Sequence, residues 1–236
     1  MESLNLASFI FLVVLFVLTP RAALRSARQL RQAQAEGRMP PRTRLVLSTM
    51  LVLTVLWFLS AMSAAVSGTS LFAIGHAGVK EIGAGVLAFC LLLLAIPVSR
   101  ALRRPEEERT QLLLSLAPRN GREFALFALV AVMAGVAEES AYRGVAVWIL
   151  APVMSNIVPA MFLSAMAFAV AHAVQGGKTM ALVFAVAVVF HLLVYVTGTL
   201  VIAMVVHVAY DLVAGYAAGQ RAKALEATDA AATAAA

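Results

Sequence analysis

The chain has 236 residues, of which 62% are hydrophobic and 13% are charged, and its mean hydropathy is +0.92. This composition excludes an ordinary soluble domain. The net charge of +6 calls for no nucleic-acid partner, because the basic residues lie beside the ends of apolar segments, where anionic lipid headgroups are their expected partners. We therefore expect an integral membrane protein that contacts the lipid bilayer and binds no nucleic acid.

Seven apolar segments follow one another along the chain, at residues 4–19, 45–66, 82–99, 124–150, 159–174, 179–196 and 199–219. Each is long enough, or nearly so, to cross a hydrocarbon core of about 30 Å at about 1.5 Å per residue. The first has no basic residue before it and no small-residue cleavage site after it, so we interpret it as a retained helix. The predicted fold class is all-α, a polytopic transmembrane bundle of about seven helices.

Basic residues predict the orientation of this bundle. Arginines are concentrated in residues 21–44 and 100–122, Lys178 follows the fifth segment, and Arg221 and Lys223 follow the last, whereas the alternate connections carry only Lys80. By the positive-inside rule the N-terminus is outside and the C-terminus cytoplasmic. Residues 21–36 are expected to form either an amphipathic helix on the membrane surface or a continuation of the first helix.

Ionisable residues inside the fourth segment require a special explanation. A charged side chain at mid-membrane costs at least about 2.5 to 3.5 kcal/mol, so such groups must face one another or water. Glu139 and Arg143 are four residues apart, which places them on one helix face and predicts an ion pair. Glu138 then remains as a spare carboxylate, which a purely structural pair would not need.

Two further motifs occur in later apolar segments. Phe168 precedes His172 by one helical turn, and His207 precedes Asp211 by one turn. A carboxylate and an imidazole can together remove a proton from water, and a second imidazole can stabilise the oxyanion formed when water attacks an amide. The same residue types also ligate zinc, but the sequence contains no His-Glu-x-x-His pattern. His191 stands outside these motifs, and we interpret it as a hydrogen-bonded packing residue.

The order Glu-Glu-x-x-x-Arg, Phe-x-x-x-His and His-x-x-x-Asp on successive apolar segments resembles the CAAX-protease and bacteriocin-processing (CPBP) family of intramembrane peptidases. This family includes the Ras-converting prenyl-protein endopeptidase. The run Thr197-Gly198-Thr199-Leu200 also resembles the stretch that precedes the family's last histidine. The resemblance implies a catalytic helical core at 124–219. Transmembrane helices and basic connections at 1–123 precede it, and the alanine-rich composition of 220–236 predicts a disordered tail.

The resemblance also implies residue roles. Glu138 would be the base that activates water with help from His172, and His207 and Asp211 would lie on the oxyanion side. Prenyl endopeptidases carry Asn where this chain has Asp211, and an ionised Asp accepts but does not donate, so we expect it to orient His207. Supporting roles would fall to Glu139, Arg143 and Phe168.

The predicted function is therefore hydrolysis of a peptide bond in a membrane-associated protein or peptide by a glutamic-type endopeptidase. We expect no cofactor, with zinc or another divalent metal as the alternative. The composition is compatible with a bacterial source, a location in the cytoplasmic (inner) membrane, and a myxosortase-like role in cleaving a C-terminal anchor. Two other functions stay open: a non-catalytic immunity or scaffold protein, and a transporter with an intramembrane polar site, although the chain lacks the internal repeat typical of transporters.

Overall fold

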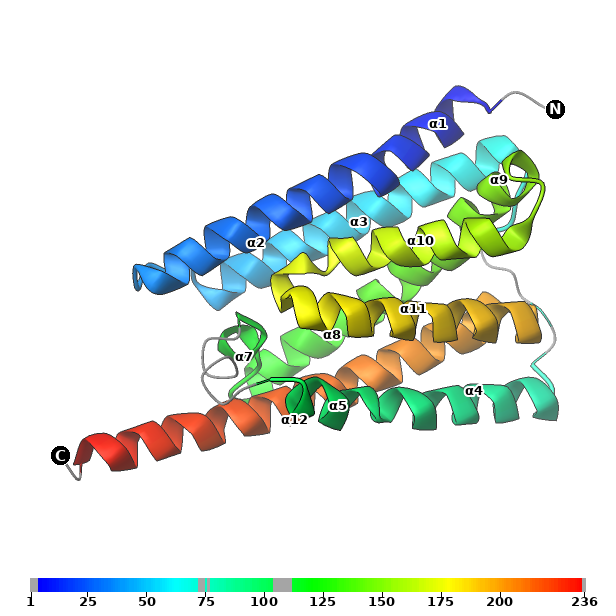
Figure 1. Ribbon diagram of the computed structural model, residues 1–236. Coiled ribbons are helices and arrows are strands. Elements are labelled where there is room, and N and C mark those ends of the chain that lie inside the picture. The colour runs from blue at the N-terminus through cyan, green and yellow to red at the C-terminus, as the bar shows by residue number, and fades with distance from the viewer. Residues whose placement is uncertain (1–3, 72–74, 76, 104–111, 235–236) are drawn as a thin grey trace.

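In the computed structural model, which describes residues 4–71, 75, 77–103 and 112–234, every regular element is a helix (Figure 1). The N-terminal half contains α1 (Leu6–Val13), the π-helical turn η1 (Val14–Leu18), α2 (Thr19–Ala35), α3 (Arg42–Ser67), α4 (Val79–Leu93), α5 (Ala95–Ala101) and α7 (Leu112–Leu116). The C-terminal half contains α8 (Gly121–Glu138), the π-helical turn η2 (Glu139–Val145), α9 (Ala146–Val153), α10 (Ile157–Ala171), the 3₁₀ turn η3 (Ala173–Gln175), α11 (Gly177–Thr197) and α12 (Leu200–Ala234).

Six continuous helical stretches are long and apolar enough to cross a membrane, and α10 is a shorter apolar helix. The 15 residues of α10 span about 22 Å at 1.5 Å per residue, less than the about 30 Å of a hydrocarbon core. Many large apolar side chains are exposed, including Val196 at 70%, as expected for a surface in contact with lipid. The structure thus confirms an all-α polytopic bundle of about seven helices.

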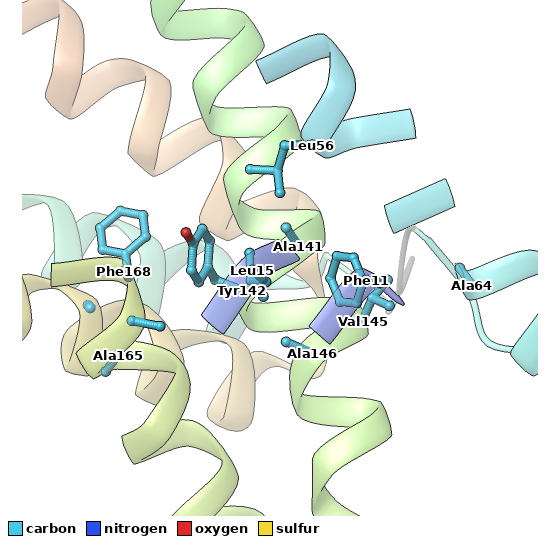
Figure 2. Packing of buried hydrophobic residues seen from close by; sticks show 12 residues of the cluster. Phe11, Leu15, Leu56, Ala64, Ala141, Tyr142, Val145, Ala146, Ala165 and Phe168 are labelled. Carbon is cyan, nitrogen blue, oxygen red and sulfur yellow. The ribbon is translucent and has the colours of Figure 1, made fainter. Parts of the chain in front are cut away.

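The segment formed by α8, η2 and α9 lies at the centre of the bundle. It packs against α3 on one side and α12 on another, while α10 packs against α9, α11 and α2. Figure 2 shows part of the core where these elements meet: Phe11 and Leu15 from the first helix and Phe168 from α10 surround Tyr142 and Val145 of η2. The motif-bearing fourth segment is consequently the most deeply buried of the six membrane-length helices.

The basic connections meet at one end of the bundle, on the left in Figure 1. Arg42 forms a 2.9 Å ion pair with Glu123 at the start of α8, and Arg31 donates to the carbonyl oxygen of Ala173 at 3.3 Å. Residues 104–111 of the second basic connection lie outside the described residues. A shared basic end is what the positive-inside pattern requires, and the side of the membrane that it faces stays a prediction.

Two segment expectations can be compared with the helices directly. Of the two alternatives for residues 21–36, the structure contains the continuation, because α1, η1 and α2 form one 30-residue helix. The expectation of a disordered tail at 220–236 is wrong for its described part, because α12 continues to Ala234. Alanine has the highest intrinsic helix propensity, and a 2.9 Å ion pair between Glu226 and Arg119 ties the extension to the segment before α8.

Candidate active site

The Glu-Glu-x-x-x-Arg motif lies where the central helix changes from α to π geometry. The N–H of Ala146 donates to the carbonyl oxygen of Ala141, five residues back, and all seven residues of η2 are buried. Single π-helical turns inside α-helices occur frequently at functional sites. Gly144 belongs to this turn, and a Cβ there would lie only 2.9 Å from the Leu200 side chain of α12, so its small size permits the close packing of η2 against α12.

The ion pair predicted from the spacing of Glu139 and Arg143 is present. Arg143 Nη1 lies 3.1 Å from Glu139 Oε1, and both side chains are fully buried. The guanidinium also lies over two aromatic rings, 4.1 Å from the Phe168 centroid and 5.2 Å from the Phe190 centroid. Arg143 is therefore held by one carboxylate and two π faces, which compensate part of the cost of burying its charge.

His207 of α12 has carboxylates on both sides of its ring. Its Nδ1 donates to Glu139 Oε1 at 2.7 Å, while its Nε2 lies 3.5 Å from Asp211 Oδ2 and 3.8 Å from Glu138 Oε2. The sequence predicts that Asp211 orients His207, and the structure adds a shorter contact from Glu139. A buried carboxylate on Nδ1 fixes both the tautomer and the direction of Nε2.

His172 directly follows Ala171, the last residue of α10, and is the C-cap residue of that helix. Its Nδ1 contacts the Phe168 carbonyl oxygen at 2.8 Å, and its ring centroid lies 4.3 Å from that of Phe168. Because a carbonyl oxygen only accepts, Nδ1 carries the proton and Nε2 of the neutral ring keeps a lone pair. His172 is partly buried and lies within electrostatic range of Glu138.

Glu138 differs from Glu139 in its surroundings. The Glu138 side chain is 15% exposed and interacts electrostatically with His172, His207 and Asp211, whereas the Glu139 side chain is 0% exposed. Adjacent helical residues project about 100° apart, which separates the two carboxylates. The structure thus brings Glu138, His172, His207 and Asp211 together around one polar region, with Glu139, Arg143 and Phe168 beside it.

Sequence reasoning missed two aromatic residues of this region. Phe190 of α11 packs against His207, with 5.2 Å between the ring centroids, and also lies against Arg143. Tyr142 of η2 meets Phe168 edge to face at 5.0 Å. Phe190 is in no motif, and Tyr142 occupies a variable position of the Glu-Glu-x-x-x-Arg motif, so tertiary packing rather than the motif identifies them. Among the residues that the structure describes, no group of three His, Cys, Asp or Glu side chains is arranged to hold a metal ion.

Fold and site together define a polytopic membrane protein with a buried carboxylate–imidazole centre. Residues 120–213 match the family model described as type II CAAX prenyl endopeptidase Rce1-like. All seven candidate site residues fall inside this match. The match confirms the resemblance drawn from the motifs and supports endopeptidase activity in general. Comparisons with curated proteins and with solved structures found no match.

Proposed function

We propose that this protein is a glutamic-type intramembrane endopeptidase in which Glu138 activates the attacking water. The observation that supports the proposal is the difference in contacts and exposure between the adjacent residues Glu138 and Glu139. Glu139 is committed to Arg143 and His207, whereas Glu138 keeps a partly exposed carboxylate near two imidazoles. A general base must be accessible to water and close to the groups that share its proton, and of the two acids Glu138 meets that condition.

In the proposed reaction, water gives a proton to the Glu138 carboxylate and its oxygen attacks the carbonyl carbon of the substrate. The neutral His172 ring assists by accepting a hydrogen bond from the same water at Nε2, because its Nδ1–H is donated to the Phe168 carbonyl oxygen. The proton on Glu138 then passes to the amide nitrogen as the C–N bond breaks. The products are a new carboxyl group and a new amine.

We assign His207 to the oxyanion side of the reaction. Its Nδ1–H is donated to Glu139, and its Nε2 is directed toward Glu138 and Asp211. In the doubly protonated form, Nε2–H donates to the oxyanion during attack, and a positioned donor of this kind contributes about 2.7 to 4 kcal/mol to the transition state. Asp211 accepts from the same nitrogen between catalytic cycles, which keeps the ring in place.

The proposed mechanism requires no metal, since the carboxylate and the two imidazoles supply a base and an oxyanion donor. The proposed substrate is a membrane-associated protein or peptide, either prenylated, a bacteriocin precursor, or a C-terminal sorting segment of the kind that a myxosortase-like enzyme cleaves. We place the protein in the bacterial cytoplasmic membrane, with the N-terminus outside and the basic end of the bundle in the cytoplasm.

The decisive experiment compares Glu138→Gln with Glu226→Gln, a matched control on the exposed extension of α12. Both proteins are reconstituted in liposomes with two internally quenched peptides: a farnesylated Cys-aliphatic-aliphatic-X peptide and an unprenylated leucine-alanine peptide that spans the bilayer. Glu138→Gln should lower kcat by about 10² to 10⁴-fold, the usual contribution of a general base, while Glu226→Gln should not change it. Full activity of Glu138→Gln would exclude Glu138 as the base.

If wild-type protein cleaves neither peptide, comparative proteomics of cells that carry wild-type or Glu138→Gln protein tests natural substrates. A membrane or secreted protein that is shortened only in the wild-type cells supports the peptidase. An unchanged proteome together with an unchanged phenotype of Glu138→Ala would instead support the immunity or scaffold alternative.

A further inference from the structure

A cavity of about 330 Å³ lies beyond Arg143 along the central helix, between α9, α10 and α11. Its volume falls at the lower end of the range found for ligand sites, about 300 to 1,000 Å³. Its walls are almost entirely apolar and include Val147, Ala151, Met161, Val194 and Leu200. The cavity is distinct from the polar region around Glu138, which precedes Arg143 in the helix.

Two polar groups, Arg143 and His191, complete the lining of this cavity. Arg143 is 2% exposed and His191 is 4% exposed. Apart from the ion pair with Glu139, the guanidinium nitrogens make no hydrogen bond with any described residue, and the same holds for His191 Nε2. Buried donors normally have partners, since leaving one unpaired costs about 1 to 3 kcal/mol. The Arg143 nitrogens are donors, and His191 Nε2 is a donor in the tautomer that carries its proton there, so in that tautomer both side chains offer the inner wall of the cavity to a hydrogen-bond acceptor.

A peptide substrate inside a membrane supplies such an acceptor. An unwound segment exposes backbone carbonyl groups, and in hydrocarbon each of them must find a donor. Arg143 follows Glu138 by five residues, or roughly 7 to 8 Å along the helix axis at about 1.5 Å per residue. An extended peptide crosses that distance in two or three residues at about 3.3 to 3.6 Å each. The carbonyl group of a residue two or three positions from the cut bond can thus reach Arg143 and His191.

We propose that this cavity is a substrate subsite, which rests on the endopeptidase function proposed above. The subsite binds one or two apolar residues of the substrate. These residues are located two or three positions from the cleaved bond. The side chains fill the space between α9, α10 and α11, and a backbone carbonyl oxygen accepts from Arg143 and from His191 Nε2–H. The volume corresponds to roughly ten groups the size of a water molecule, which is about the heavy-atom count of one to two apolar residues.

A lipid acyl chain is the competing occupant. It would match the apolar walls, but a hydrocarbon chain has no acceptor along its length and would leave the donors of Arg143 and His191 unpaired. A peptide satisfies both the walls and the donors. The peptide is therefore the occupant that the lining favours, and lipid is an outcome that the experiment must be able to detect.

Site-specific photo-cross-linking tests binding without requiring turnover. A benzophenone side chain replaces Val194, which lines the cavity, or Val196, which is 70% exposed on the same helix, in protein that also carries Glu138→Gln. The probe is the biotinylated leucine-alanine peptide in liposomes of defined phospholipid. The proposal predicts severalfold more peptide cross-linking from position 194 than from 196. Equal cross-linking at both positions, or cross-linking of position 194 to phospholipid alone, would overturn it.

Kinetics of filled-cavity variants provide the second test. Val194→Phe should raise KM for the quenched peptides by about tenfold or more with kcat little changed, because one apolar group in a pocket is worth about 10 to 200-fold. The control variant Val196→Phe should have the same KM and kcat as the wild-type protein. His191→Leu should also raise KM, because it removes a donor to the backbone carbonyl group, but it should leave the preference for an apolar residue two or three positions from the cut unchanged.

The outcomes separate the subsite from the catalytic proposal. Normal cleavage by wild type together with identical KM values for Val194→Phe and Val196→Phe would refute the subsite and leave the endopeptidase intact. Conversely, peptide cross-linking at position 194, together with wild-type protein that cleaves neither peptide and shortens no protein in the proteomic comparison, would support the binding site and contradict the catalytic assignment. If Val194→Phe does not fold, the cross-linking result decides.

Discussion

Replacing Arg143 with Met should destabilise the protein strongly, because the substitution leaves a buried carboxylate without its cation. Glu139 and Arg143 are 3.1 Å apart and fully buried, and the guanidinium lies over the rings of Phe168 and Phe190. Methionine preserves much of the apolar length of the side chain but removes the charge and both cation–π contacts. The variant thus isolates the electrostatic part of the interaction.

The expected loss can be estimated from the contacts. Breaking a buried ion pair by removing one partner costs about 3 to 5 kcal/mol. Glu139 retains its 2.7 Å hydrogen bond from His207, so we expect the lower end, about 3 kcal/mol. For chains of about 150 to 250 residues, 1 kcal/mol shifts Tm by about 2 to 4 °C, so Tm in detergent should fall by roughly 6 to 12 °C.

Thermal unfolding of purified protein measures this shift, and a double variant supplies the control. Adding Glu139→Gln to Arg143→Met removes the unpaired charge, so the double variant should recover part of the lost stability. The coupling between contacting residues of this kind is about 0.5 to 3 kcal/mol. An Arg143→Met variant with the Tm of the wild-type protein would show that the ion pair does not stabilise the bundle. A double variant with a lower Tm than Arg143→Met alone would show the same.

Three other outcomes follow from the structure. With Cys90 removed, cysteines at Ser70 and at exposed Ala35 should react with a membrane-impermeant thiol reagent from opposite sides, and labelling from one side would refute the predicted topology. Gly135→Ala should lower kcat, because the added Cβ would lie 2.6 Å from the Val208 side chain and would push α8 away from α12, which carries His207. An unchanged kcat would contradict this close packing. Activity should survive EDTA and phenanthroline, with well under one equivalent of zinc bound, whereas loss on chelation and recovery with stoichiometric zinc would make the site residues metal ligands.

Most membrane-length helices could be predicted from hydropathy, because lipid demands long apolar runs with internally satisfied backbones. The second segment, expected at 45–66, corresponds to α3 (Arg42–Ser67). Hydropathy does not report helical structure outside the hydrocarbon region. Hydropathy therefore does not decide between the two alternatives for residues 21–36, and it does not predict the helical end of α12.

The site was predictable to the extent that it depends on local spacing. The ion pair between Glu139 and Arg143 follows from residues one turn apart on one helix. The hydrogen bond from His207 to Glu139 joins residues 68 positions apart, and it depends on how closely α8 and α12 approach. That approach occurs at Gly135, one turn before Glu139, where a Cβ would lie 3.1 Å from the Met204 carbonyl oxygen. No spacing within a single segment reveals it.

The adjacent acids of the motif have a physical explanation in this arrangement. A lone catalytic carboxylate at mid-membrane would have to be accessible to water and also hold the imidazole opposite it in position, and these demands conflict. In this bundle Glu139 is buried and holds both Arg143 and His207 Nδ1, so Glu138 keeps only looser contacts, 3.8 Å from His207 Nε2. In the proposed mechanism, fixing His207 through the neighbouring acid would leave Glu138 free to exchange a proton with water.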